Sequence, residues 1–431
     1  MGRRIAIIGA GFLGLTVALR CAKRGDAVTV FESGPEIGGL AASWHIGGIR
    51  WDKHYHVTLL SDSYTRAIVE EIGLGDEFRW VETRTGFYSG GKLYSMSNTM
   101  EFLRFPPLDL ISKLRLGGTI FYASKVKDWH RLEKISVEEW LTRLSGRKTF
   151  QRMWRPLLRA KLGDSYKETS AAFIWATIQR MYAARRSGLK REMFGYVRGG
   201  YARVLGRFGE RLTELGVEIK LNTRAKSVHS GGGRVKVEAE GLSEDFDLVL
   251  LTCPPRAAAG MLRGLTREEK ALHESIPYQG IICASLILKR PLSEFYVTNI
   301  TDETPFTGII EMTALVEKSE FDGNSLVYLP KYLSPNDGMF TETDEIIEER
   351  FLAGLEAMYP ELSRSDVAEM KISRVKEVFP IPVVGYSERV APVRTSINGV
   401  YVLNSSHITN GTLNVNETVQ LAETFFRDHL C

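Results

Sequence analysis

The 431-residue sequence has no apolar run of the roughly 18 residues that a membrane-spanning helix requires. Cysteine is also scarce: Cys21, Cys253, Cys283 and Cys431 form neither a C-x-x-C pair nor a Cys/His cluster with zinc-site spacing. These absences exclude a membrane-spanning protein, a disulfide-stapled secreted domain and a zinc-binding module. We therefore expect a cytoplasmic protein, either free or held at the inner face of the membrane.

The sequence also lacks internal repeats, low-complexity segments and any recognisable nucleic-acid-binding motif, so a nucleic acid is not expected as a partner. Its 44% hydrophobic and 25% charged residues are typical of a globular protein, and its length suits two or three domains of about 150 residues. The net charge is +4, but residues 101–200 hold 21 Lys and Arg against 9 Asp and Glu. This excess predicts an anionic partner, and both an anionic membrane surface and a phosphate-bearing substrate remain open.

The beginning of the chain carries the clearest motif. Residues 4–9 form an Ile-rich apolar run, the pattern of a parallel strand buried on both faces. Gly9, Gly11 and Gly14 follow as G-x-G-x-x-G, and a helix is predicted over residues 12–24. The N-terminus of such a helix favours phosphate, so this unit predicts a dinucleotide site. A signal peptide would also begin with basic and apolar residues, but three glycines interrupt this stretch and no cleavage site follows it.

A second predicted strand, residues 27–31, ends at Glu32, where a carboxylate can accept both hydroxyls of an adenosine ribose. The same charge would repel the 2′-phosphate of NADP. Downstream, Ser33 leads to Gly38-Gly39-Leu40. With these residues the sequence resembles the flavin-containing amine oxidase superfamily, which includes protoporphyrinogen oxidases and phytoene-type desaturases. In that family the Gly-Gly pair lies against the pyrophosphate of FAD, and an Arg often stands where this chain has Leu40.

The resemblance implies non-covalent FAD and extends to two later parts of the chain. A predicted helix over 204–216, strands over 217–221 and 247–253, and a hairpin over 226–229 and 235–239 match the second FAD segment of the family. A strand within 399–407 and a helix over 414–426 match the third, although Asn404-Ser405 replaces the usual Gly-Asp or Gly-Glu. Val228 would meet the adenine through its backbone. The implied FAD-binding residues are Gly9, Gly11, Phe12, Leu13, Gly14, Glu32, Ser33, Gly38, Gly39, Leu40, Val228, Asn404 and Asn414.

Two histidines are candidates for catalysis. His54 and His56 stand at i and i+2, so on an extended segment both would point to one face, where they could bind a phosphate or carry a proton. The alternative is a core histidine hydrogen-bonded to backbone. No third ligand is spaced to complete a metal site with them. Counted back from Lys289, Cys283 occupies the position of a lysine that amine oxidases of the family carry near the flavin, which argues against oxidative deamination.

The basic region contributes Arg155 as a third catalytic candidate. Together with Arg152, Arg159, Arg185 and Arg186 it lies in a helical stretch over 136–191, and such arginines could clamp a phosphate. Before this stretch, the pattern predicts a capped helix over 61–75 and a hairpin over 86–95 that turns at residues 90 and 91. Leu108, Ile111, Leu114 and Leu116, interleaved with Lys113 and Arg115, predict a basic amphipathic helix that contacts either a membrane or the core.

The resemblance covers nearly the whole chain. It implies a doubly wound α/β FAD domain assembled from residues 1–60, 196–260 and 386–431, with an inserted α+β substrate domain from residues 61–195, which carry a helical cap, and 261–385. The expected function is an FAD-dependent oxidoreductase that moves a hydride to or from a carbon–carbon bond of an apolar small molecule, isoprenoid or phosphorylated. The alternatives are a redox-neutral flavin enzyme acting on a nucleotide sugar, and an amine oxidase. The oligomeric state is not predicted.

Overall fold

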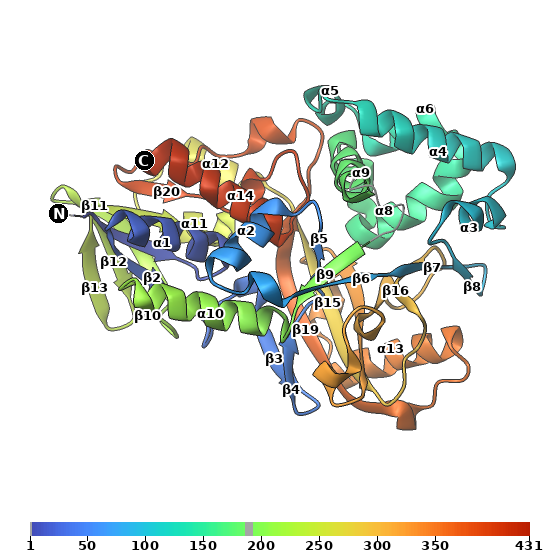
Figure 1. Ribbon diagram of the computed structural model, residues 1–431. Coiled ribbons are helices and arrows are strands. Elements are labelled where there is room, and N and C mark those ends of the chain that lie inside the picture. Colours follow the sequence, from blue (N-terminus) through green and yellow to red (C-terminus); the bar gives the residue numbers. More distant parts are fainter. Residues whose placement is uncertain (1, 186–192) are drawn as a thin grey trace.

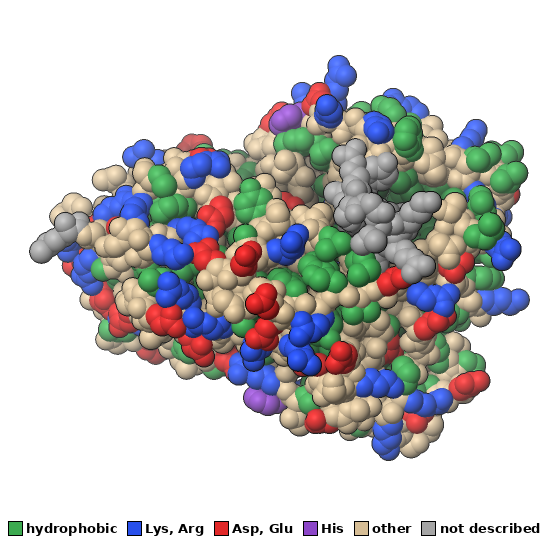
Figure 2. Space-filling view, in the orientation of Figure 1, with side chains coloured by type: hydrophobic (Ala, Val, Ile, Leu, Met, Phe, Trp, Pro, Cys, Tyr) green, Lys and Arg blue, Asp and Glu red, His purple; other side chains and the backbone are tan. Residues whose placement is uncertain are grey.

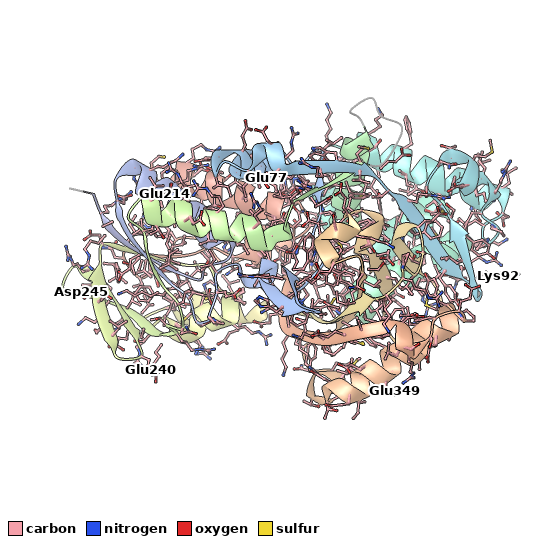
Figure 3. The ribbon with its side chains drawn as sticks, turned by 60° about the horizontal axis from the view of Figure 1, so that its bottom comes forward. Glu77, Lys92, Glu214, Glu240, Asp245 and Glu349 are labelled. Carbon is pink, nitrogen blue, oxygen red and sulfur yellow. The ribbon has the colours of Figure 1, made fainter. Side chains whose placement is uncertain are left out.

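The structure is a computed structural model that describes residues 2–185 and 193–431. Two domains lie side by side, and the chain passes between them several times (Figure 1). Seen from a second direction, Glu214 and Asp245 lie in one domain, and Lys92 and Glu349 lie at the far end of the other (Figure 3). This arrangement confirms the predicted fold class, a doubly wound α/β domain with an inserted α+β domain and a helical cap.

The first domain is built on a parallel sheet whose strands come from three distant parts of the chain. The strand order is β10-β2-β1-β14-β20, with β1 in the centre. Residues 5–8 of β1 are buried, as expected of an apolar strand covered on both faces. The strands are β1 Arg4–Ile8, β2 Ala27–Phe31, β10 Glu218–Lys220, β14 Leu248–Leu251 and β20 Val400–Val402.

Both faces of the parallel sheet are covered. On one face, side chains of α1 (Phe12–Arg24), α2 (Ser63–Glu71), α10 (Gly200–Glu214) and α14 (Val415–Phe425) share one apolar core with the sheet. On the other face, an antiparallel sheet and α11 share a second apolar core with the parallel sheet, and α12 contacts α11. The strands are β11 Ala225–Gly231, β12 Arg234–Ala239 and β13 Leu242–Phe246, and the helices are α11 Pro255–Met261 and α12 Arg267–Ser275.

The second domain is organised by a mixed sheet in the order β19-β15-β18-β17-β16-β7-β8. Ile282, Ala284 and Leu286 of β15 pack toward α13 (Asp344–Met358), whereas Ile281 and Cys283, which point the other way, face the first domain and the cap. The strands are β7 Arg84–Ser89, β8 Lys92–Ser95, β15 Tyr278–Leu288, β16 Phe295–Ile300, β17 Gly308–Glu311, β18 Ser325–Leu333 and β19 Val367–Pro380.

A helical cap covers the edge of this sheet opposite α13 (Figure 1). Its apolar core also includes Tyr278 and Phe379 of the sheet, which ties the cap to the strands beneath it. The cap consists of α3 Thr99–Arg104, α4 Leu110–Lys125, α5 His130–Glu133, α6 Val137–Ser145, α7 Arg147–Thr149, the π-helical turn η3 Phe150–Trp154, α8 Arg155–Leu162, η4 Gly163–Lys167 and α9 Ala171–Arg185.

Small sheets connect the two domains. They are the hairpin β3 Ser43–Ile46 and β4 Ile49–Asp52, and the antiparallel set β5 Thr58–Leu59, β9 Met193–Val197 and β6 Phe78–Glu82. Ile68, Val69 and Ile72 of the α2 region lie in the core of the parallel sheet. We therefore propose that the first FAD segment extends past α2, beyond the boundary that the sequence predicts at residue 61.

Most predicted elements are confirmed, including the hairpin turn, where Gly90 and Gly91 have φ values of 59° and 71°. The predicted side-chain cap of α2 is wrong. Asp62 does not accept from the first turn of α2; instead the amide oxygen of Asn416 accepts the N–H groups of Tyr64 and Thr65. The predicted start of α10 at residue 204 is also wrong, because the helix begins at Gly200.

The glycine turn after β1 yields a stability test. A methyl group on Gly14 would collide with the backbone carbonyl of Gly9, whereas one on Gly11 would meet nothing within 4 Å. We expect Gly14→Ala to lower the free energy of unfolding by about 1–3 kcal/mol, the usual cost of overpacking. Gly11→Ala should stay within about 0.5 kcal/mol of wild type. Urea unfolding followed by tryptophan fluorescence measures both values, and equal values for the two variants would contradict this account of the turn.

Candidate functional site

The glycine turn presents free backbone donors at the carboxyl end of the parallel sheet. Gly9 has a φ of 110°, a conformation suited to glycine, and Gly11 precedes α1 without a side-chain cap. The N–H groups of the first helical turn, Phe12, Leu13 and Gly14, therefore lack the usual cap. The side chains of Phe12 and Leu13 point into the core. This end of α1 thus has the donors, the dipole and the open space that a phosphate group needs.

Glu32 lies beside this turn, at the end of β2. Its two carboxylate oxygens accept the N–H groups of Ala10, at 2.9 Å, and Gly34, at 2.7 Å. These bonds fix the carboxylate next to the glycine turn, while Ser33 is exposed. The backbone of residues 222 and 223 is bonded to Gly34 and Glu32, so this segment forms the opposite wall of the site.

The pair Gly38-Gly39 lies directly against the glycine turn. Gly38 forms a parallel bridge with Gly11, and its N–H donates to the carbonyl of Ala10 at 2.8 Å. A methyl group on Gly39 would lie 3.3 Å from the Cα of Gly11, so a side chain would crowd the space between the two segments. The following Leu40 contributes its carbonyl to His54.

Asn404 and Asn414 lie at the end of β20 and the start of α14. The side-chain oxygen of Asn404 accepts from the N–H and hydroxyl of Ser406, but its amide nitrogen is buried without a partner. The side-chain oxygen of Asn414 accepts the N–H of Glu417 at 3.0 Å and so caps α14. A buried amide donor without an acceptor is costly, which suits a site that a ligand completes.

Val228 does not present a free backbone carbonyl, because that oxygen accepts the N–H of Arg263 at 3.0 Å. The segment 222–225 lies next to Glu32. A β-bulge between Ala225 and Ser227 interrupts the hydrogen-bond ladder between β11 and β12 at this point. Residues 222 and 223 are bonded to Gly34 and Glu32, and the adenine contact of Val228 stays a prediction.

Taken together, the glycine turn, Glu32, the Gly38-Gly39 pair and Asn404 line one continuous edge of the parallel sheet. Its features fit a dinucleotide that carries a flavin: uncapped helix donors for the pyrophosphate, a carboxylate for the ribose and an unpaired amide farther along. In residues 2–185 and 193–431, no three His, Cys, Asp or Glu side chains lie close enough to hold a metal ion.

Asp52, at the end of β4, joins this edge to α10. It is 2% exposed, and its Oδ1 accepts the N–H of Tyr201 at 2.9 Å in the first turn of α10. Burial raises the pKa of Asp52 to about 8, although the N–H of Tyr201 acts in the opposite direction. The hydroxyl of Tyr328, in the second sheet, donates to the backbone carbonyl of Asp52. Asp52 therefore holds a helix of one domain and a strand of the other.

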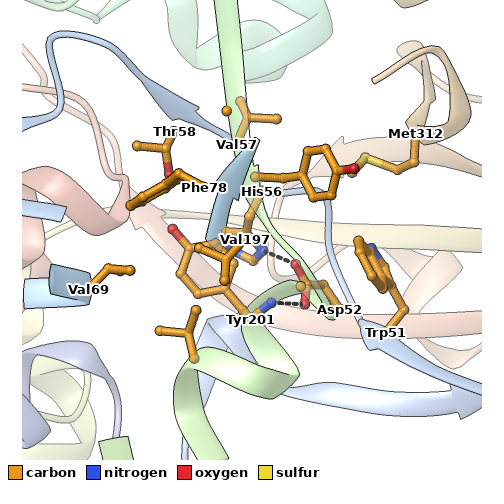
Figure 4. Close-up of a pocket in the computed structure, with 14 residues that line it drawn as sticks. Trp51, Asp52, His56, Val57, Thr58, Val69, Phe78, Val197, Tyr201 and Met312 are labelled. Carbon is orange, nitrogen blue, oxygen red and sulfur yellow. Dashed lines mark hydrogen bonds and ion pairs between the residues drawn. The ribbon is translucent and has the colours of Figure 1, made fainter. Parts of the chain in front are cut away.

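His56 lies next to Asp52 in a cavity of about 10 Å³, roughly the space of one water molecule (Figure 4). Its Nδ1 is 3.8 Å from Oδ2 of Asp52 and has no hydrogen-bond partner, and its ring centre is 5.1 Å from that of Tyr201. Burial lowers the pKa of His56 to about 4. The imidazole is therefore neutral near pH 7.

His54 has different hydrogen-bond neighbours from His56, and the prediction that both rings share one face stays a prediction. Its Nδ1 lies 3.4 Å from the carbonyl of Leu40, and its Nε2 lies 3.1 Å from the hydroxyl of Ser373 on β19. Burial lowers its pKa to about 4 as well. Burial removes the positive charge that would attract a phosphate, and phosphate binding or proton transfer by this pair stays a prediction. The bond to Leu40 matches the alternative of a core histidine.

A third group of polar side chains, which the sequence did not reveal, lies between the cap and the second sheet. Lys161 of α8 donates to the hydroxyl of Tyr332 at 2.6 Å, and Tyr332 is 2.8 Å from the hydroxyl of Tyr55. Tyr55 stands between the two histidines in the chain. The hydrogen bonds thus lead from the cap to the segment that contacts Leu40.

Arg155, the other catalytic candidate, is exposed on the outer side of α8, as is Arg159, and Arg152 of η3 is also exposed. Arg159 pairs with Asp164, and Arg152 donates to the carbonyl of Pro107. The side chains of Arg185 and Arg186 lie outside the described residues. The structure therefore separates the described arginines of this group from the interior polar groups.

Comparison with known proteins places these features in context. A sequence model of the family described as flavin containing amine oxidoreductase matches residues 14–415. The zeta-carotene desaturase of Synechocystis sp. is 26% identical over 205 residues, which cover 42% of this chain and 42% of that protein, less than half its length. The fold matches an oxidoreductase from Methanosarcina mazei with a TM-score of 0.78, at 18% identity and over 99% of this chain and 100% of that one. It also matches reduced UDP-galactopyranose mutase, with a TM-score of 0.76, at 16% identity and over 99% and 95% of the two chains.

The role of Asp52 can be tested with two substitutions. Asp52→Ala leaves the buried N–H of Tyr201 without an acceptor, so the free energy of unfolding should fall by about 1–3 kcal/mol. Asp52→Asn keeps an oxygen at the same position and should cost clearly less. Chemical unfolding at one fixed pH measures both, and a loss as large for Asn as for Ala would show that the hydrogen bond to α10 is not what Asp52 contributes.

Proposed function

Because the chain belongs to the flavin-containing amine oxidoreductase family, we propose that it is an FAD-dependent oxidoreductase that moves a hydride to or from a carbon–carbon bond of an apolar small molecule. This proposal rests on the continuous edge of the parallel sheet that runs from Glu32 through Gly11 and Gly39 to Asn404. An edge of this length suits a dinucleotide and exceeds what a single nucleotide needs. Bound there, a flavin supplies the hydride chemistry, and the protein supplies position and surroundings.

Each part of this edge has a distinct task in the proposal. Glu32 accepts the hydroxyls of the ribose, and residues 222–225 border the adenine. The N–H groups at the start of α1 and the Gly38-Gly39 backbone hold the pyrophosphate. The amide of Asn404 and the first turn of α14 serve the flavin end. The other cofactor candidates, Ser33 and Leu40, flank these contacts.

The protein side of the reaction centre is formed by the segment 52–56 and the facing sheet. His54 and His56 are neutral, and Tyr55 keeps its proton near pH 7 because burial raises its pKa to about 12. These groups can donate or accept hydrogen bonds without bringing in charge, which suits an apolar substrate. Cys283 is fully buried on the sheet face that points to this segment, so no lysine occupies that position.

An exposed apolar surface on the cap supports a greasy substrate taken from a lipid phase. Leu110, Ile111 and Leu114 of α4 are 65%, 67% and 66% exposed, and Phe121 on the same helix is also exposed. Figure 2 shows hydrophobic side chains next to Lys and Arg at the edge of the molecule where Figure 1 places α3 and α4. Surfaces of this kind commonly mark an interaction site. We propose peripheral contact with a membrane through this face.

The cap helix differs from the basic amphipathic helix that the sequence predicts. Leu108 and Leu116 are buried, whereas Ile111 and Leu114 face outward, so the apolar residues are divided between the core and the surface. Lys113 is buried and donates to the carbonyl of Leu103. Within residues 2–185 and 193–431, no helix is long and apolar enough to cross a bilayer.

The proposal is tested by anaerobic mixing of the purified flavoprotein with a panel of isoprenoid, porphyrin-type, amine and nucleotide-sugar compounds. We expect an apolar compound with a saturated carbon–carbon bond to bleach the oxidised flavin absorbance, because a hydride leaves the substrate. Turnover of a nucleotide sugar only after reduction with dithionite would support the redox-neutral alternative instead. Bleaching by amines alone would contradict both.

A further inference from the structure

Lys161 is an ammonium group in an unusual setting. It lies on the inner side of α8 with Leu158 and Leu162, which are buried, whereas Arg155 and Arg159 of the same helix face outward. Its Nζ lies 3.9 Å from the ring centre of Tyr332 and 4.9 Å from that of Phe379. Aromatic faces attract a cation, so these rings favour the charged form.

No carboxylate compensates this charge among the described residues. The acid nearest in sequence, Asp164, pairs with Arg159 instead. Burial lowers the pKa of Lys161 to about 7, and no neighbouring charge adds to that effect. The only polar group that accepts a hydrogen bond from Lys161 in the described part of the chain is the hydroxyl of Tyr332. An ammonium carries three protons, so it can donate to further acceptors.

A second donor without an acceptor lies close to Lys161. Gln279 of β15 is 1% exposed, and its amide nitrogen has no hydrogen-bond partner. Gln279 pairs with Phe379, the ring beneath the ammonium, in the β15–β19 ladder. A methyl group on Gly163, two residues beyond Lys161, would lie 3.8 Å from that amide nitrogen. The two donors therefore neighbour the same ring and the same turn.

The donors outnumber the acceptors at this point. Tyr55 and Tyr332 share one hydrogen bond, and both keep their protons near neutral pH because burial raises the pKa of each phenol. His54 farther along is neutral and already bonded to Ser373. Lys161 and Tyr332 are both partly accessible, so a ligand atom can approach them. One donor, Gln279, is fully buried and the other, Lys161, is partly accessible, an arrangement that suits an oxygen ligand.

We propose that Lys161 and Gln279 form a binding site for an anionic oxygen group, carboxylate or phosphate, at the polar end of the substrate. The site lies at the junction of the cap and the second sheet, and Tyr332 and Tyr55 connect it to the segment that faces the proposed flavin position. The substrate class is then an amphiphile, with an apolar chain and one acidic end. This inference rests on the proposed function and narrows it.

The test measures binding of simple probes to the FAD-loaded protein by isothermal titration calorimetry: octanoate, octyl phosphate and 1-octanol, which share a chain and differ in the end group. We expect at least one anion to bind more tightly than 1-octanol by about tenfold to a hundredfold, as charge-assisted hydrogen bonds imply. The difference between octanoate and octyl phosphate identifies the acidic group.

Lys161→Met should remove this preference while keeping the volume of the side chain, and Gln279→Leu should weaken it in part. Arg159→Met, which removes a charge from the outer side of the same helix, should leave it unchanged. Flavin content of each variant shows that it is folded. Equal binding of all three probes by the wild type, or an anion preference that survives in Lys161→Met, would overturn the inference. Failure of the wild type to retain FAD would instead overturn the proposed function.

Discussion

The structure depends on one parallel sheet. The chain adds the strands of this sheet in three separate segments, and the second domain is built between them. β1 is bonded on one side to β2, which follows directly, and on the other to β14, which lies more than two hundred residues later. β20 adds the last strand from near the end of the chain. Because backbone groups of central strands must be paired, the excursions that build the second domain have to begin and end at fixed places. The cap and second sheet are thereby held over the carboxyl ends of β1 and β2.

A few buried polar contacts set the position of the second domain relative to this sheet. Asp52 binds the start of α10 through its carboxylate and Tyr328 through its carbonyl. Arg180 of the cap pairs with Asp62 ahead of α2. Two of these contacts, Tyr328 to Asp52 and Arg180 to Asp62, join groups of different domains, so each domain stabilises the other. Lys161 and Gln279, which are proposed for substrate binding, lie farther into the second domain, between the cap and the second sheet.

The sequence predicts what depends on neighbouring residues. The glycine turn, Glu32 and the turn at residues 90 and 91 carry their geometry in a few adjacent positions. The sequence does not predict a contact whose two residues lie far apart in the chain. The start of α10 depends on Asp52, and the first turn of α2 is satisfied by Asn416. The sequence pattern predicts one charged surface before residue 162. In the structure, Lys161 lies on the inner side of α8, whereas its basic neighbours Arg155 and Arg159 lie on the exposed side. The adenine contact of Val228 stays a prediction, and the β-bulge between Ala225 and Ser227 changes the register of that hairpin in a way that the sequence pattern does not show.

We propose that the edge of the parallel sheet binds a flavin dinucleotide along its whole length. Thermal unfolding of flavin-free protein with added ligand tests it directly, since a ligand that binds only the folded state raises the melting temperature. FAD should raise it strongly, and FMN should do so weakly, because FMN lacks the ribose and adenine that Glu32 and residues 222–225 border. An equal shift with FMN, or no shift with FAD, would contradict the account.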